Sequence, residues 1–293
     1  MPIGIIAVSA GAAQHLSLLA QSNSNQYLYC LEGSAVKVFS DNGIKVEMIP
    51  LPKLIEKSNE ILVGRCWESN LGLIAIKAAK QKSIKVSVTL DHWNFSEQEF
   101  DLGGEIILPD QFIVYDQFAY LEAKRIFPYV NVVCYPNLYL NKMKSGFENL
   151  KLNFVPQNNQ ILYLAEPIDS HNKLNSIFKR DKVNNFSELE AFKFFLANID
   201  KICQNIESIK VRPHPSQNVN SIIQKFKEID HRIEVSEEKE LIKDLFNSQY
   251  IVGCQTYALV VALFCGKKTF SSMPLNSGNS VLPFSEIIML RDL

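Results

Sequence analysis

Residues 250–270, YIVGCQTYALVVALFCGKKTF, contain a complete strand–helix–strand unit. The short apolar run 250–252 ends at Gly253, and the apolar run 256–264 is long enough for a helix. Gly266 follows this run, and glycine is a typical residue after the last turn of a helix. Units of this kind form parallel sheets with right-handed crossovers. The segment therefore favours the α/β class.

The same alternation of short β-branched runs and amphipathic stretches continues along the rest of the chain. In the second half it predicts a long helix over 187–206 and the following strands: 161–165, 208–212, 233–235, 250–252 and 268–270. In the first half it predicts a helix over 69–81 and these strands: 3–8, 27–30, 61–63, 85–90 and 111–114.

The alternation pauses over 136–160, where we place a linker because no clear period survives. A chain of 293 residues that is 47% apolar is long enough for two hydrophobic cores. We therefore predict two Rossmann-like, doubly wound parallel-sheet domains that face a cleft. The first, residues 1–145, would bind an acceptor, and the second, residues 146–293, would bind a nucleotide.

The near-equal numbers of basic and acidic residues limit which partners the protein could bind by charge alone. Lys and Arg number 30 and Asp and Glu 31, so bulk electrostatics would hold neither nucleic acid nor an anionic membrane strongly. We expect no nucleic-acid partner and at most peripheral membrane association. No apolar run reaches the length of a membrane span, the start lacks a basic signal-peptide region, and the six cysteines form no CxxC pair. These features predict a cytoplasmic protein.

Ligands of open parallel sheets bind beyond the carboxyl ends of the strands, and a His-Pro turn follows one of those ends. The segment VRPHPSQ, residues 211–217, places Arg212 and His214 at the end of a predicted strand. Pro213 and Pro215 stiffen the turn. The imidazole can then donate a hydrogen bond to a phosphate or a ribose. The alternative is a loop histidine that caps a helix.

Two other strand ends in the second half carry polar residues. Gln255 and Thr256 lie at the predicted start of a helix, where free N–H groups and the macrodipole favour an anion. Thr256 alone could instead be an ordinary N-cap. Glu166, which follows the strand 161–165, could accept hydrogen bonds from a ribose or a base, or it could be a solvated loop acid.

The His-Pro turn and the helix start at Gln255 together resemble the motifs of GT-B glycosyltransferases that use CMP-activated sugars. The bacterial sialyl- and polysialyltransferases and the Kdo transferases are the groups that the pattern most resembles. The resemblance covers about the last ninety residues and implies that His214, Pro215, Gln255 and Thr256 contact the nucleotide. Gln255 stands where that group usually has serine, and its acidic base motif survives only as Glu32-Gly33.

The first half offers candidates for the acceptor site and the catalytic base. Asp91 and His92 follow the strand 85–90, and an inverting sugar transfer needs a base near the acceptor hydroxyl. We take Asp91 as the first choice and His92 as the second. Trp93 could stack on a sugar. The alternative is that Asp91 caps a turn and Trp93 belongs to the core.

Two further loops of the first half follow strand ends. Gly11 and Ala12 would let the backbone approach an acceptor closely. Arg65, after the strand 61–63, could meet an anionic acceptor or the donor carboxylate, or it could be a surface cation.

The sequence favours sugar transfer that needs no metal and no cofactor. The histidines form no HxH or HxxxH pair, no DxD element occurs, and no GxSxG elbow is present. The expected partners are a nucleotide-sugar donor and a glycan acceptor. The alternatives are a UDP-sugar epimerase or hydrolase of similar fold and a non-catalytic module that binds nucleotide or glycan.

Overall fold

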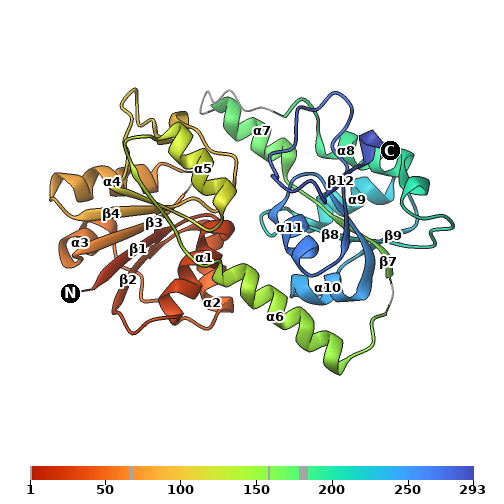
Figure 1. Cartoon of the computed structure of the whole chain (residues 1–293), viewed down its shortest axis with the longest axis horizontal. Helices are drawn as coiled ribbons and strands as arrows, with labels where there is room; N and C mark the ends of the chain where they lie inside the picture. Colours follow the sequence, from red (N-terminus) through yellow and green to blue (C-terminus); the bar gives the residue numbers. More distant parts are fainter. Residues whose placement is uncertain (1, 66–68, 158, 178–183) are drawn as a thin grey trace. The chain divides into compact units, whose positions relative to one another are not determined.

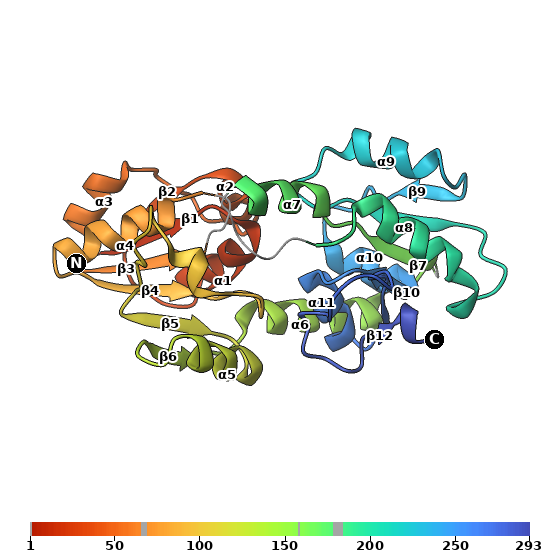
Figure 2. The same cartoon turned by 90° about the horizontal axis from the view of Figure 1, so that it is seen from above.

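The computed structural model describes residues 2–65, 69–157, 159–177 and 184–293. The chain divides into two units, Met1–Tyr139 and Leu140–Leu293. Each unit contains a six-stranded parallel sheet with helices on both faces (Figures 1 and 2). The predicted α/β class and the parallel sheets are confirmed.

The first sheet has the order β2-β1-β3-β4-β5-β6. Its strands are β1 (Ile3–Ala7), β2 (Tyr27–Leu31), β3 (Glu60–Gly64), β4 (Lys85–Thr89), β5 (Gln111–Val114) and β6 (Asn131–Cys134). Strand order reverses between β1 and β3, which are parallel neighbours. In open α/β sheets such a switch point is where ligands bind.

Helices surround this first sheet. They are α1 (Ala10–Gln21), α2 (Gly33–Asp41), α3 (Leu51–Lys57), α4 (Leu71–Gln81) and α5 (Gln117–Ile126), with a 3-10 turn at Glu97–Phe100. α1 packs beside α2, and α3 packs beside α4 on the other side of the sheet (Figure 2).

The second sheet has the order β12-β11-β10-β7-β8-β9. Its strands are β7 (Asn159–Leu164), β8 (Ile209–Arg212), β9 (Ile233–Val235), β10 (Ser248–Gly253), β11 (Lys268–Ser271) and β12 (Ile288–Met289). Numbered within the unit, this order is 6-5-4-1-2-3, the arrangement of dinucleotide-binding Rossmann domains. Its switch point lies between β7 and β10.

The helices of the second sheet begin with the one that connects the two units. They are α6 (Leu138–Asn153), α7 (Ile168–Ile177), α8 (Glu188–Ala197), α9 (Val219–Lys227), α10 (Leu241–Asn247) and α11 (Tyr257–Phe264). Short 3-10 turns follow at Ile199–Lys201 and Leu290–Asp292.

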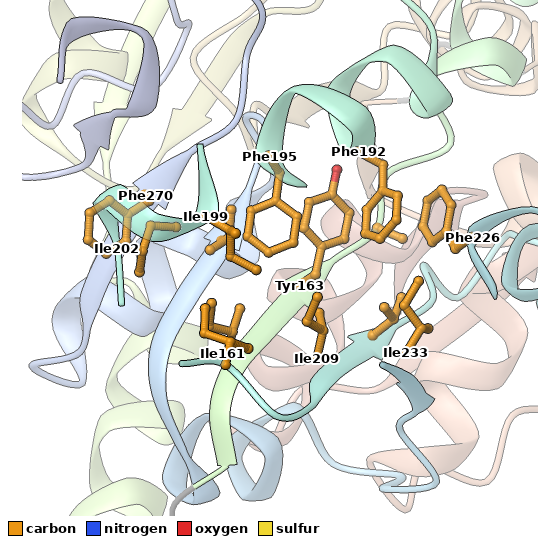
Figure 3. Close-up of a cluster of buried hydrophobic side chains, with 14 of the residues drawn as sticks. Ile161, Tyr163, Phe192, Phe195, Ile199, Ile202, Ile209, Phe226, Ile233 and Phe270 are labelled. Atoms are coloured by element: carbon orange, nitrogen blue, oxygen red, sulfur yellow. The ribbon is translucent and has the colours of Figure 1, made fainter. Parts of the chain in front are cut away.

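Aromatic rings join α8 and α9 to the second sheet. Phe192 of α8 stacks on Phe226 of α9 with ring centroids 4.0 Å apart, and Tyr163 of β7 lies 5.0 Å from Phe192. Phe195 stacks on the other side of Tyr163 at 5.1 Å. Figure 3 shows these four rings in a row above the isoleucines of the strands. The row fixes the position of α8 on the sheet.

Two elements differ from the sequence predictions. The stretch 136–160, which we interpreted as a linker, contains the helix α6. Its buried face consists of Phe147, which packs against Phe246 of α10, and one buried side chain gives no readable period. The helix predicted over 187–206 ends at Ala197, where the Asn198 side chain bonds the carbonyl of Phe194.

Candidate functional site

The carboxyl edge of the second sheet carries a carboxylate at its switch point. Glu166 follows β7, and its Oε1 accepts hydrogen bonds from the backbone N–H groups of Cys254 (2.9 Å) and Gln255 (2.7 Å). These groups lie between β10 and α11. The helix start that we predicted would receive a phosphate therefore holds a carboxylate of the chain itself.

Glu166 is an acid that titrates near neutrality. Burial raises its pKa to about 7, and the nearby Glu188 acts in the same direction. The N–H groups that it accepts from Cys254, Gln255 and Thr256 oppose the rise, because they stabilise the charged form. Sequence reasoning placed Glu166 in the site but could not show that it meets residues almost ninety positions away.

The two predicted residues at the start of α11 are also engaged within the chain. The side chain of Gln255 donates to Asn184 Oδ1 at 3.2 Å, and its buried Oε1 has no partner among the residues that the structure describes. The Thr256 hydroxyl accepts from the N–H of Ala258 at 3.3 Å, which makes it the N-cap of α11.

The His-Pro turn fixes the tautomer of His214. The N–H of Ser216 donates to His214 Nδ1 at 3.2 Å, and the Ser216 hydroxyl lies 2.8 Å from the same nitrogen. Burial lowers the pKa of His214 to about 4, so the ring is neutral at pH 7. With Nδ1 acting as an acceptor, the proton lies on Nε2, and this N–H can donate a hydrogen bond to a ligand. Pro215, the next residue of the turn, is exposed.

Two further titratable residues at this edge were missed from sequence. Glu188, the first residue of α8, accepts from the side chain of Gln217 at 3.1 Å, and its N–H donates to Asp169 Oδ1 at 3.3 Å. Burial, with Asp169 second, raises the pKa of Glu188 to about 7. In α7, burial and then His214 lower the pKa of His171 to about 4.

A signal for Glu188 was present in the sequence. Ser187 and Glu190 form a capping box, which marks the first turn of α8. A helix that follows a strand in a doubly wound sheet begins at the carboxyl edge, where ligands bind. The capping box would therefore have placed Glu188 at this edge.

Arg212, predicted to bind the nucleotide, makes bonds within the chain. Its guanidinium pairs with Asp244, which is completely buried, and donates to the carbonyl oxygens of Glu238 (2.8 Å) and Lys239 (2.9 Å). The Ser236 hydroxyl also bonds Asp244. Arg212 thus fixes the segment after β9 rather than presenting a free charge to a ligand.

The first unit places a carboxylate beside a helix start as well. Asp91 follows β4, and a Cβ built on Gly11 would lie 2.1 Å from its Oδ2. The carboxylate thus occupies the space that any larger residue at Gly11 would need. Burial raises the pKa of Asp91, while the charge of Arg65 opposes the rise. Ala12, the next residue of α1, is completely buried.

Arg65 and its neighbours are tied together inside the first unit. Arg65 Nε donates to Glu99 at 2.6 Å in an ion pair of which both side chains are almost buried. Its guanidinium also bonds the carbonyl of Asn94, and its own carbonyl accepts from Ser9 at 3.2 Å. Arg65, which we expected to contact a ligand, therefore stabilises the loops around Asp91.

His92 and Trp93 form part of the same loop. The N–H of Asn94 donates to His92 Nδ1 at 3.4 Å, and the His92 ring lies edge-on to Trp93 at 5.3 Å. The Trp93 indole N–H donates to Asp116 at 2.9 Å, and the residue is 9% exposed. Little of the ring could therefore stack on a sugar.

The described ranges contain neither a candidate metal centre nor a candidate membrane span. Within them, no group of three or more His, Cys, Asp or Glu side chains is arranged to hold a metal ion. In that part of the chain no helix combines the length and apolar character of a membrane span.

Known proteins resemble this chain in structure but not in sequence. No family model and no curated protein matches it. The UDP-GlcNAc 2-epimerase of Neisseria meningitidis, bound to UDP-GlcNAc, is similar over 88% of this chain and 79% of its own, with a TM-score of 0.60 and 15% identity. S. aureus MnaA with UDP is similar over 92% and 79%, with a TM-score of 0.61 and 13% identity.

A third similar structure is the glycotransferase of kitacinnamycin, over 100% of this chain and 88% of its own, with a TM-score of 0.51 and 11% identity. Such low identities show the fold alone. The expectation of a CMP-sugar transferase therefore stays a hypothesis. The chain has a two-unit α/β fold of the GT-B-like kind.

Proposed function

We propose that this chain is an enzyme that acts on a nucleotide-activated sugar and transfers the sugar to a glycan acceptor. The observation that carries the proposal is the carboxyl edge of β7, β8 and β10. There the neutral His214 carries an Nε2–H donor on a proline-braced turn, and Gln217 connects that turn to Glu188, one of two glutamates with a pKa of about 7. Clustered groups with shifted pKa values at a switch point are typical of functional sites.

The proposed donor site uses His214 as a hydrogen-bond donor to the phosphate, with Pro215 holding the turn and Gln255 and Glu166 near the nucleotide. The resemblance of the His-Pro turn favours a CMP-linked nonulosonic acid or Kdo as the donor. Positioning and phosphate stabilisation would then provide most of the rate.

The proposed acceptor site lies in the first unit. Asp91 is the proposed base, with His92 as the second choice. Gly11, which is exposed in the first turn of α1, is the proposed acceptor surface, and the completely buried Ala12 is not part of it. The raised pKa of Asp91 suits a base, because a carboxylate that binds protons more readily abstracts them more easily.

A UDP-sugar 2-epimerase is the second candidate. Two of the similar structures are UDP-GlcNAc 2-epimerase with UDP-GlcNAc and MnaA with UDP, and they support a UDP-sugar as the ligand. An epimerase needs groups that exchange protons near pH 7, and the two glutamates meet that need.

Calorimetric titration with CMP, CDP, UDP and GDP tests the nucleotide site. We expect one of them to bind and His214→Ala to weaken that binding about 10- to 100-fold, because a hydrogen bond to a charged phosphate is lost. His231→Ala is the matched control, since His231 is exposed and lies at the opposite edge, before β9. Failure of all four nucleotides to bind would contradict the proposal.

Product analysis separates the two candidates. Incubating the protein with UDP-GlcNAc and no acceptor should leave the sugar intact if the chain is a transferase. Appearance of the C2 epimer would establish the epimerase instead. CMP-N-acetylneuraminic acid and CMP-Kdo, with and without a glycan acceptor, test the CMP-sugar hypothesis in the same assay.

A further inference from the structure

We propose that Glu188 is the general acid of the donor site and that Gln217 is the residue that positions it. This inference rests on the proposed nucleotide-sugar function. In it, Glu188 lies in the phosphate subsite as a neutral carboxyl and donates its proton to the phosphate oxygen that leaves the sugar.

The geometry of Gln217 connects the His-Pro turn to Glu188. The amide oxygen of Gln217 accepts from the backbone N–H of His214 at 2.8 Å, and its amide nitrogen donates to Glu188 Oε1 at 3.1 Å. One planar group thus fixes the carboxyl relative to the turn that presents His214. Glu188 is also the first residue of α8. The stacking of Phe192 on Phe226 holds this helix in place and therefore limits the movement of Glu188.

The groups around Glu188 are mostly acids. Asp169 of α7 and Glu166 after β7 face it, as do the thiol of Cys254 and the phenol of Tyr163. Lys225 of α9 is the cation that acts in the opposite direction. A phosphate could enter such surroundings only if the carboxyls gave up their charge, since like charges repel.

Protonation removes that conflict. Burial and Asp169 raise the pKa of Glu188 to about 7, so a large fraction is neutral at pH 7. A neutral carboxyl is a hydrogen-bond donor as well as an acceptor. His214 cannot provide the proton in the same way, because its pKa of about 4 leaves the ring uncharged.

The bond between the anomeric carbon and the phosphate oxygen breaks, and its electron pair goes to that oxygen. The carboxyl proton of Glu188 moves to the same oxygen and leaves a carboxylate. The acceptor hydroxyl bonds to the anomeric carbon and loses its proton to the base. The base then releases its proton to water, and Glu188 takes up a proton from water, so that both groups return to their starting states.

The test compares Glu188→Gln with Glu207→Gln, an exposed glutamate of the same unit. With the donor identified above, we expect Glu188→Gln to lower kcat about 100-fold or more with little change in KM. In the wild type, kcat should fall as the pH rises above about 7, because the acid loses its proton. This alkaline decrease should disappear in Glu188→Gln and persist in Glu207→Gln.

Two more variants separate positioning and folding from catalysis. Glu188→Asp keeps an acid and should recover part of kcat together with the alkaline decrease. Gln217→Ala should lower kcat and keep the alkaline decrease, since the carboxyl remains, but move it to higher pH, because the hydrogen bond that lowers the pKa of Glu188 is lost. A Glu188→Gln protein with the kcat and pH profile of Glu207→Gln would overturn the inference. A wild type that binds no nucleotide would instead overturn the proposed function on which it rests.

Discussion

Both units place a carboxylate next to the helix that follows a strand of their switch point, but they surround it differently. In the first unit Asp91 lies against Gly11 at the start of α1, and Arg65 is close enough to lower its pKa. In the second unit Glu166 binds the start of α11, and Glu188 raises its pKa further. A carboxylate with a cation nearby suits a structural role or the role of a base. Two interacting acids suit proton exchange with a ligand.

The largest effect that we expect concerns the buried ion pair of the second unit. Arg212→Met leaves the completely buried Asp244 without its cation and should lower the free energy of unfolding by about 3–5 kcal/mol. Urea unfolding measures the change. Arg125→Met removes a cation from an exposed pair and should change the free energy of unfolding far less, because solvent screens such a pair. Equal losses for the two variants would mean that Arg212 is not a structural residue.

Next in size is the effect of pH through Glu166. Its pKa rises from the ordinary 4.5 to about 7 on folding, so the folded state binds more protons between these pH values. The contribution of Glu166 to stability is therefore present below about pH 4.5 and is lost as the pH rises to 7. Relative to Glu166→Gln, the wild type should lose roughly 2 kcal/mol over this range. Parallel stability curves for the two proteins, from urea unfolding at each pH, would contradict the raised pKa.

The smallest effect tests the carboxylate of the first unit. Gly11→Ala places a methyl group against Asp91 Oδ2, which must turn away, and should cost about 1–2 kcal/mol. Gly146→Ala is the control, because its methyl group would meet nothing within 4 Å inside α6. That change should stabilise the protein by about 0.5–1 kcal/mol. Thermal unfolding of both variants measures the difference, and a neutral Gly11→Ala would show that Asp91 has room to move.

Strands were easier to predict than helices that bury few side chains. The expected strands 111–114 and 233–235 coincide with β5 and β9, because short apolar runs between polar residues have few alternatives. β6 was missed, since it lies at the sheet edge and its end residues are exposed. Helix α6 was missed because it buries Phe147 alone.

The site was harder to predict than the fold because its contacts join distant parts of the chain. Glu166 and Gln255 were both chosen from strand ends, but their hydrogen bond depends on β7 lying beside β10. The pairing of Arg212 with Asp244 likewise follows from tertiary packing, which one sequence does not display. Local rules identified the positions, and only the packed sheet identified the partners.

The row of rings beneath α8 connects the interior of the second unit to the proposed acid. Phe192 lies one helical turn after Glu188 and is stacked on Phe226. A smaller residue there would loosen the helix whose first residue is the proposed acid. Such a substitution, hidden in the interior, could change turnover while every group that meets the ligand keeps its chemistry.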